Sequence, residues 1–308
     1  MIPQFHSLVE LLEAFPDEQS CIDHLASIRW RNGEFCPYCG HEVIYHFKDK
    51  RTYKCASCRQ RFSIKVGTIF EETHIALKKW FIAIYLITCH KKGISSLQLS
   101  KDIKVTQKTA WFMLHRLREA SKAKNFSTPL KNKVEIDETY IDSKEKNKHA
   151  NKRVEGTQGR NTKTKTAVVA LVERGGSVRA FKVDDVSSQT LKGLVHNHVA
   201  LGAMVFSDDF RAYTELTPFY SHRIVKHGEG EYVVGDAHTN TAEGFFSQFK
   251  RGLVGIYHLM SKKHLGRYLN EFAFRYNIRK QQNGNDFTAL LSNIEGKLTY
   301  QELIANEN

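Results

Sequence analysis

Three acidic residues, far apart in the sequence, occupy positions at which carboxylates could hold metal ions. Asp137 lies in an apolar segment expected to be a strand, Asp208 ends a second such strand, and Glu243 lies in the first turn of a helical segment. An unpaired charge at the end of a buried strand is costly without a partner or a metal. Three converging carboxylates can hold two Mg²⁺ or Mn²⁺ ions about 4 Å apart for phosphoryl transfer.

The residues around these acids leave two assignments open. Each aspartate has an acidic neighbour, Glu138 or Asp209, and strand alternation does not say which of each pair faces the site. Asn240 as an N-cap, with Glu243 three residues later, fits a capping box, which would give Glu243 a purely structural role. Lys250 lies seven residues after Glu243, two turns along the same helix face, where its ammonium could bind a phosphate.

Four of the six cysteines form two C-x-x-C pairs, with fifteen residues between the pairs. Each C-x-x-C turn directs two thiolates at one ion, and a hairpin in the spacer would bring the two turns together. The sequence predicts one structural zinc ion, and its ligands are Cys36, Cys39, Cys55 and Cys58. Four protein ligands leave no open coordination position, so this site serves structure and DNA docking rather than catalysis. Cys21 and Cys89 are expected to be core thiols.

Helical periodicity begins at Leu77 and leads into a helix-turn-helix pattern. Residues 96–103 predict a short helix, 104–105 a turn, and a second helix begins at Thr106. The apolar side chains behind the second helix are those of Ala110, Met113, Leu114 and Leu117. The residues expected to contact DNA are Thr106, Gln107, Lys108, Thr109 and Arg116. A plain helical packing bundle is the alternative interpretation.

From residue 134 onward the pattern becomes α/β. The expected strands are residues 134–142, 166–173, 177–183 and 203–208, with 222–227 as a further candidate. Helices are expected at 187–200, 241–259 and 262–279, which together predict a mixed sheet with flanking helices. The segment 143–165 carries eight Lys or Arg residues against two Glu, and is expected to be a flexible loop that could clamp phosphates.

The overall composition favours a folded protein with a polyanionic partner. Among 308 residues, 46 Lys and Arg outnumber 33 Asp and Glu, for a net charge of +13. Nucleic acid is the expected partner, and an anionic membrane surface is the alternative. The longest apolar stretch, Trp80–Cys89, is too short to cross a bilayer, and the first residues do not form a signal peptide. A soluble, cytoplasmic, nucleoid-associated protein is therefore expected.

Two C-terminal segments resemble a known family. HTNTAEGFFSQFKRGLVGIYH and KKHLGRYLNEFAFRYNIR resemble the catalytic helix and C-terminal segment of bacterial insertion-sequence transposases of the DDE class with an N-terminal zinc ribbon. Asp137 in EIDETYI and Asp208 in FSDDFRAY resemble the first two acids of that family, and 34 residues separate Asp208 from Glu243. Some relatives carry Asn in the third position, which makes Asn240 the alternative to Glu243.

The resemblance implies a multidomain chain of zinc ribbon, helix-turn-helix and ribonuclease-H-like catalytic domain. The expected divisions are 1–72, 73–126, 130–285 and a C-terminal tail at 286–308. The implied reaction is hydrolysis at the element's ends by metal-activated water, followed by attack of the freed 3′-hydroxyl on target DNA. Lys250 and Arg251 would then contact DNA, and His238 could do so.

Joining two element ends implies at least two active sites, so a homo-oligomer is expected on double-stranded DNA that carries terminal inverted repeats. A non-enzymatic DNA-binding regulator is the main alternative, because a zinc ribbon and a helix-turn-helix would suffice for one. A nuclease or resolvase on the same fold is another. An HNH nuclease is not expected, because His196, Asn197 and His198 lie within a helical pattern.

Overall fold

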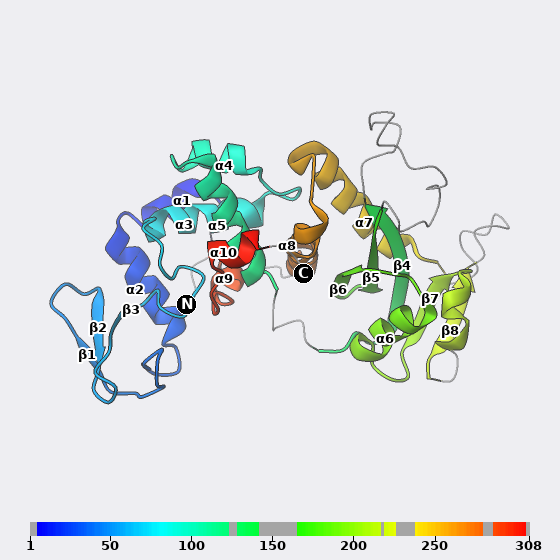
Figure 1. The fold of residues 1–308 in the computed structure, drawn as a ribbon, viewed down its shortest axis with the longest axis horizontal. Coiled ribbons are helices and arrows are strands. Elements are labelled where there is room, and N and C mark those ends of the chain that lie inside the picture. Colours follow the sequence, from blue (N-terminus) through cyan, green and yellow to red (C-terminus); the bar gives the residue numbers. More distant parts are fainter. Residues whose placement is uncertain are drawn as a thin grey trace. The chain divides into compact units, whose positions relative to one another are not determined.

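The chain forms two compact units. The computed structural model describes residues 5–122, 128–141, 165–216, 219–225, 238–279 and 286–305. The first unit comprises Met1–Lys122 together with Ile278–Asn308, and the second comprises Ala123–Asn277 (Figure 1).

The first unit begins with two helices and a small antiparallel sheet. Helices α1 (Leu8–Ala14) and α2 (Glu18–Arg29) precede the strands β1 (Ile44–His46), β2 (Thr52–Cys55) and β3 (Arg61–Ser63). The strands pair in the order β1-β2-β3. Between β1 and β2, the Asp49 carboxylate accepts the backbone N–H groups of Arg51 and Thr52 and closes the turn. The hairpin expected in the spacer between the cysteine pairs is therefore present.

Three further helices follow in the first unit: α3 (Leu77–Cys89), α4 (Ser96–Asp102) and α5 (Gln107–Ala120). Four residues join α4 to α5, and one of them, Lys104, has a positive φ of 51°. Thr106 caps α5 by accepting the N–H of Thr109. The apolar positions expected behind α5 are all buried: Ala110, Met113, Leu114 and Leu117. The two helices and their turn match the expected pattern, and their role in DNA binding stays a prediction.

The described part of the C-terminal segment belongs to the first unit. It contains the helices α9 (Asp286–Leu291) and α10 (Tyr300–Ile304). The Phe287 ring lies 5.4 Å from the rings of both Phe5 and Phe81, between centroids. The zinc-ribbon and helical segments likewise share this one unit. Local periodicity cannot reveal such a long-range partner, because it reports only which face of an element is apolar.

The two remaining cysteines differ from each other. Cys21 is fully buried, as expected of a core thiol. Cys89 is exposed, so the expectation of a core thiol there is wrong. It is the last residue of α3.

The second unit is built on a five-stranded mixed sheet. Its strands are β4 (Lys133–Ile141), β5 (Thr166–Glu173), β6 (Val178–Val183), β7 (Met204–Asp208) and β8 (Ser221–Val225). They lie in the order β6-β5-β4-β7-β8. The first three strands pair antiparallel, whereas β7 pairs parallel with β4 and β8 parallel with β7. This arrangement confirms the expected mixed sheet.

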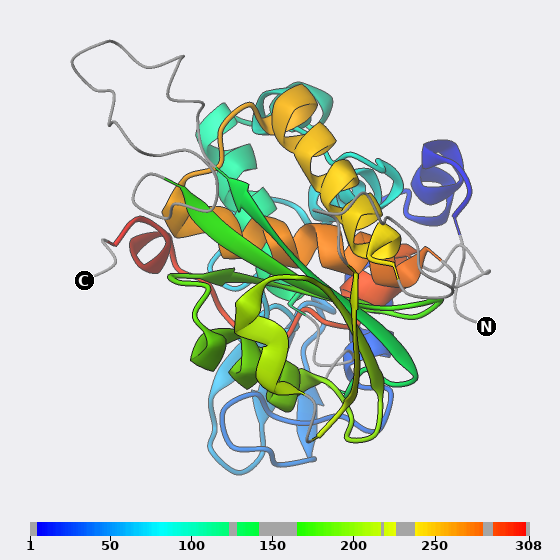
Figure 2. The same ribbon diagram turned by 90° about the vertical axis from the view of Figure 1, so that its right-hand side faces the viewer.

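Helices cover both faces of this sheet (Figure 2). Helix α6 (Ser188–His198) packs on one face, against a core that includes Val134 and Ile136. Helices α7 (Asn240–Gly252) and α8 (Leu265–Ile278) pack on the other face. Val168 and Ala170 of β5 contribute to this second core. Burial on both faces explains why β5 reads as a continuous apolar run rather than an alternating one.

In the part of the chain that the structure describes, no helix is both long enough and apolar enough to span a membrane. His196, Asn197 and His198 are the last three residues of helix α6, which agrees with the helical pattern predicted for them. Most of the basic segment that was expected to clamp phosphates, residues 143–164, lies outside the described residues.

Phe287→Ala tests whether the C-terminal segment belongs to the core of the first unit. Removing a buried phenyl ring costs about 3–5 kcal/mol of unfolding free energy. We expect this loss in denaturant unfolding followed by circular dichroism. Ile304→Ala, at a half-exposed position of α10, is the control and should change stability by less than about 0.5 kcal/mol. Equal stability of the two variants would contradict this packing.

Candidate active site and metal centre

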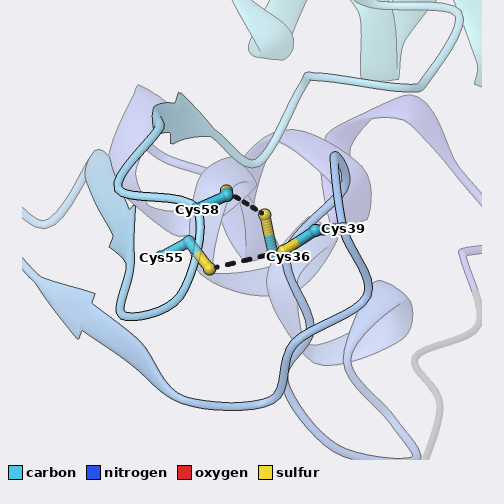
Figure 3. A group of neighbouring side chains, drawn as sticks. All are labelled: Cys36, Cys39, Cys55 and Cys58. Atoms are coloured by element: carbon cyan, nitrogen blue, oxygen red, sulfur yellow. Dashed lines mark hydrogen bonds between the residues drawn. The ribbon is translucent and has the colours of Figure 1, made fainter.

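The four predicted zinc ligands meet at one point of the first unit (Figure 3). Their sulfur atoms all lie within 4.8 Å of one another. Cys36 Sγ is 3.7 Å from Cys58 Sγ, and Cys39 Sγ is 3.6 Å from Cys55 Sγ. A tetrahedral zinc ion with Zn–S bonds of about 2.3 Å would separate its sulfurs by about 3.8 Å. The donor set and its spacing therefore fit one Zn²⁺ ion.

Backbone amides point at two of the four sulfur atoms. The N–H groups of Tyr38 and Ser57 point at the sulfurs of Cys36 and Cys55, at 3.4 and 3.3 Å. Burial acts to raise the pKa of Cys55, but hydrogen bonds from backbone N–H groups outweigh burial and lower this pKa to about 6. Thiolate is the form that binds metal. The second C-x-x-C turn thus favours the metal-binding form of Cys55.

The strand register places the two candidate aspartates side by side. Glu135 of β4 pairs with Phe206 of β7 in the parallel ladder. Asp137 and Asp208 each lie two residues further along, on the sheet face that α7 covers. Glu138 points to the opposite face, where its carboxylate accepts the hydroxyl of Tyr213 at 2.8 Å. The structure therefore selects Asp137 over Glu138 for the face of α7.

Asp208 and Asp209 differ in their position relative to the end of β7. Asp208 is the last residue of this strand, and its Oδ1 accepts the N–H of Phe210 at 3.1 Å. Asp209 lies beyond the strand and is exposed. Asp208 is the member of the pair that acts electrostatically on Asp137.

A pocket of about 600 Å³ lies between β4 and α7. Its lining brings together Asp137, Glu243, Lys250 and Arg251, with Phe246 and Val254 as apolar neighbours. Asp208 and Asn240 are not among the lining residues. Among the described residues, only the four cysteines have ligand atoms that all lie within 4.8 Å of one another. Asp137 and Glu243 thus line one pocket, and Asp208 lies close enough to act electrostatically on Asp137.

Electrostatics of this pocket centre on Asp137. Burial raises the pKa of Asp137 to about 7, and the nearby carboxylates of Glu138, Asp208 and Glu243 act in the same direction. A hydrogen bond from the backbone N–H of Glu138, at 2.8 Å, opposes this shift. Like charges gathered at a partly buried site favour a bound cation, because a cation relieves their repulsion.

The expected capping box at the start of α7 is absent. Thr239 rather than Asn240 is the N-cap, and its side chain makes no capping hydrogen bond to the helix backbone. The Thr239 hydroxyl donates to the Glu243 carboxylate instead, at 3.3 Å. The carboxylate of Glu135 accepts the first N–H groups of α7. A carboxylate on a neighbouring strand replaces the local cap, so Glu243 is not tied to Asn240.

Glu135 is the residue of this region that the sequence analysis missed. Its side chain is completely buried, and it lies two residues before Asp137 on the same face of β4. A charged residue flanked by Val134 and Ile136 in an apolar strand was the available signal. His238, considered as a possible DNA contact, has its Nδ1 atom 3.1 Å from Glu135 Oε1 and is one-quarter exposed.

Arg116 is a second correction. Its side chain is buried, and its guanidinium donates to the backbone carbonyls of Leu298, Ile69 and Glu71 at 2.8–3.0 Å. A guanidinium enclosed in this way links segments of the first unit and does not face DNA. It lies more than two turns beyond the exposed start of α5, on the side that packs inward.

The other predicted DNA contacts lie at the start of α5. Thr106, Gln107 and Lys108 are exposed, and Thr109 is partly buried. Gln107 donates to the Ser96 hydroxyl at 2.8 Å, and the Lys108 ammonium lies 4.8 Å from the centre of the Tyr300 ring. These contacts hold the polar side chains in place on an exposed helix end.

Two family models match the chain. Residues 129–277 match the ISXO2-like transposase domain, and residues 16–61 match the transposase zinc-ribbon domain. A protein of Halobacterium salinarum, described as an uncharacterized protein in transposable element ISH50, is 33% identical over 279 residues. This alignment covers 87% of the present chain and 93% of the halobacterial protein.

Solved structures with some similarity are complexes of the Mos1 transposase. The Mos1 strand transfer complex aligns with 64% of this chain and 75% of its own, at 14% identity and a TM-score of 0.23. The pre-cleavage Mos1 transpososome aligns with 70% of this chain and 79% of its own, at 12% identity and a TM-score of 0.19. TM-scores of this size are too low to establish a common fold.

Cys55→Ser tests the metal centre. We expect the wild-type chain to carry one zinc ion and the variant to lose it, because a structural zinc ion needs all four ligands. Metal content is measured by elemental analysis of the purified protein. Cys89→Ser, at an exposed cysteine outside the cluster, should keep its zinc. Zinc retained in Cys55→Ser would argue against a four-cysteine site.

Asp137→Asn tests the electrostatics of the pocket. Folded Asp137 has a pKa near 7 against an ordinary value of 3.8, so the folded chain binds a proton that the unfolded chain releases. Stability of the wild type therefore falls as pH rises between these values. We expect Asp137→Asn to gain up to about 2 kcal/mol relative to wild type between pH 5.5 and 8 in magnesium-free buffer.

The measurement is chemical denaturation of both proteins at each pH. Asp209→Asn, at the exposed neighbour of Asp208, is the matched control and should follow the wild type at both pH values. A pH-independent difference between Asp137→Asn and wild type would show that Asp137 titrates normally.

Proposed function

Because the chain belongs to the ISXO2-like transposase family, we propose that it cuts double-stranded DNA at the ends of its element and joins the freed ends to target DNA. The observation that carries this proposal is the pocket between β4 and α7, which is lined by Asp137 of β4 and by Glu243, Lys250 and Arg251 of α7. Carboxylates for metal ions beside cations for phosphates are the groups that phosphoryl transfer on DNA requires.

Each group of the pocket has a role in this reaction. Asp137, Asp208 and Glu243 would hold two Mg²⁺ or Mn²⁺ ions. When bound, such ions supply activation of the attacking oxygen and neutralisation of charge on the leaving oxygen. Lys250 and Arg251 would bind the flanking phosphates. Glu243 is favoured over Asn240 as the third ligand, because its carboxylate, like that of Asp208, acts electrostatically on Asp137.

The two chemical steps need no covalent link to the protein. In the first, a water oxygen bonds to phosphorus while the bond from phosphorus to the 3′-oxygen breaks, which leaves a 3′-hydroxyl. In the second, this hydroxyl bonds to a phosphorus of target DNA and a target 3′-oxygen leaves. The pocket's task in both steps is to orient the scissile phosphate, which Lys250 can do from the helix face two turns beyond Glu243.

The architecture of the second unit supports this proposal. Three antiparallel strands followed by two parallel strands, in the order β6-β5-β4-β7-β8, agree with the ribonuclease-H-like domain that the sequence resemblance implies. In such a sheet, residues of the central strand and its parallel neighbour lie side by side, as Asp137 and Asp208 do.

The first unit is the proposed DNA-recognition part. The exposed start of α5 offers Thr106, Gln107 and Lys108 to bases and phosphates, in the manner of a recognition helix. The zinc ribbon would dock beside it, and the net charge of +13 supports binding to a polyanion. Because two element ends must be joined, we propose that at least two copies act together on DNA.

The test is cleavage of DNA that carries the sequences flanking this reading frame, with Mg²⁺ or Mn²⁺. Glu243→Gln should lower the cleavage rate by more than about 100-fold, because bound ions contribute several kcal/mol to the reaction. Asn240→Ala should cut within a few-fold of wild type. Gln248→Ala, at an exposed position of α7 outside the pocket lining, is the control for changes in the helix.

The outcomes separate the possible assignments. Loss of cutting in Asn240→Ala but not in Glu243→Gln would move the third ligand to Asn240. A wild-type chain that binds these flanks but cuts them with neither metal would favour a DNA-binding regulator.

A further inference from the structure

A buried carboxylate beside the pocket is not accounted for by the proposed chemistry. Glu135 is completely buried in the central strand β4. An ionised carboxylate in such a place is unfavourable unless charged groups and hydrogen-bond donors surround it. The contacts of the Glu135 carboxylate therefore show which elements it joins.

The first contacts of Glu135 are with the start of α7. Oε2 accepts the backbone N–H groups of Thr241 and Ala242, at 2.7 and 3.0 Å, and Oε1 accepts the Thr241 hydroxyl at 2.9 Å. The first N–H groups of a helix have no acceptor within the helix and carry partial positive charge. Glu135 therefore caps α7 in place of Thr239. The two capped residues, Thr241 and Ala242, directly precede Glu243.

The second set of contacts involves Arg174, which follows β5. Its Nε donates to Glu135 Oε1 at 2.6 Å, and another nitrogen of its guanidinium donates to the backbone carbonyl of His238 at 2.8 Å. The guanidinium carbon also lies 4.0 Å from the ring centre of Phe206, two residues before Asp208 in β7. One ion pair thus contacts β4, β7 and the residues that lead into α7.

Glu135 does not have the geometry of a metal ligand. Both of its oxygens already accept hydrogen bonds from the chain, and the residue does not line the pocket. Its position is nevertheless close to every candidate ligand, because each of the three elements it joins carries one of the acids.

We propose that Glu135 and Arg174 form a positioning pair that fixes the first turn of α7 against β4 and β7, and so sets the place of Glu243 relative to Asp137 and Asp208. The consequence for catalysis rests on the proposed function, whereas the fixing of the helix start does not. Loss of the pair leaves the acids in the chain but misplaces Glu243.

Glu135→Gln is the first test, because it conserves shape and removes the charge. The amide NH₂ would face donors in either orientation: Arg174 Nε on one side, or the N–H groups of Thr241 and Ala242 on the other. Hydrogen exchange followed by mass spectrometry reads this out without any DNA or catalytic metal. We expect exchange in a peptide spanning residues 240–246 to become about tenfold faster, while β5 stays protected as in wild type.

The second measurement is the Mg²⁺ dependence of flank cleavage. Displacing a metal ligand through its supporting residue typically costs about 10–100-fold in metal affinity or activity. We expect Glu135→Gln to need at least tenfold more Mg²⁺ for half-maximal cleavage, with binding to flank DNA unchanged. Arg174→Lys keeps the charge but loses the second donor, and should show a smaller shift in the same direction. Glu173→Gln, an acid at the end of β5 outside the pair, should match wild type.

The outcomes are distinct. Unchanged exchange at the start of α7 in both pair variants would overturn the proposal, as would faster exchange with an unchanged Mg²⁺ requirement. If Glu135→Gln proves insoluble, Arg174→Lys decides by the same two measurements. Failure of the wild type to cut would refute the proposed function instead, and the exchange result would still decide whether the pair fixes the helix.

Discussion

The carboxylate of Glu135 is the constraint on which the second unit depends. A negative charge buried in the middle of a sheet requires opposite charge around it, and this chain supplies the positive end of α7 and the guanidinium of Arg174. Because these partners come from different parts of the chain, neutralising one charge also orders three elements. The same face of β4 then presents Asp137 at the pocket, two residues away.

The pocket brings a carboxylate of β4 together with one carboxylate and two cationic side chains of α7. Asp137 is partly buried, and burial together with the acids around it raises its pKa to about 7. Lys250 and Arg251 are exposed on α7. The apolar face of the same helix packs on the sheet through Phe245 and Phe249. One amphipathic helix therefore anchors the site with one face and supplies its polar groups with the other.

Contacts between segments far apart in the sequence help to hold the first unit together. In the ribbon, four cysteine sulfurs lie together, and the helices of the unit contact residues from the C-terminal part of the chain. The guanidinium of Arg116 donates to the carbonyl of Leu298, and the ring of Phe287 packs against that of Phe81. Arg116, which was expected from the sequence to contact DNA, thus holds segments of this unit together.

The sequence by itself determined the cysteine cluster, the family, the strands and helices of the second unit and the pair of helices α4 and α5, because short-range spacing and periodicity encode them. It also identified Glu243 and Lys250 as neighbours on one helix face. Tertiary structure alone decided which acid of each pair faces α7, why Arg116 is buried and where residues 286–305 pack. It also replaced the expected capping box with Glu135, since a cap from another strand depends on contacts between residues more than a hundred positions apart.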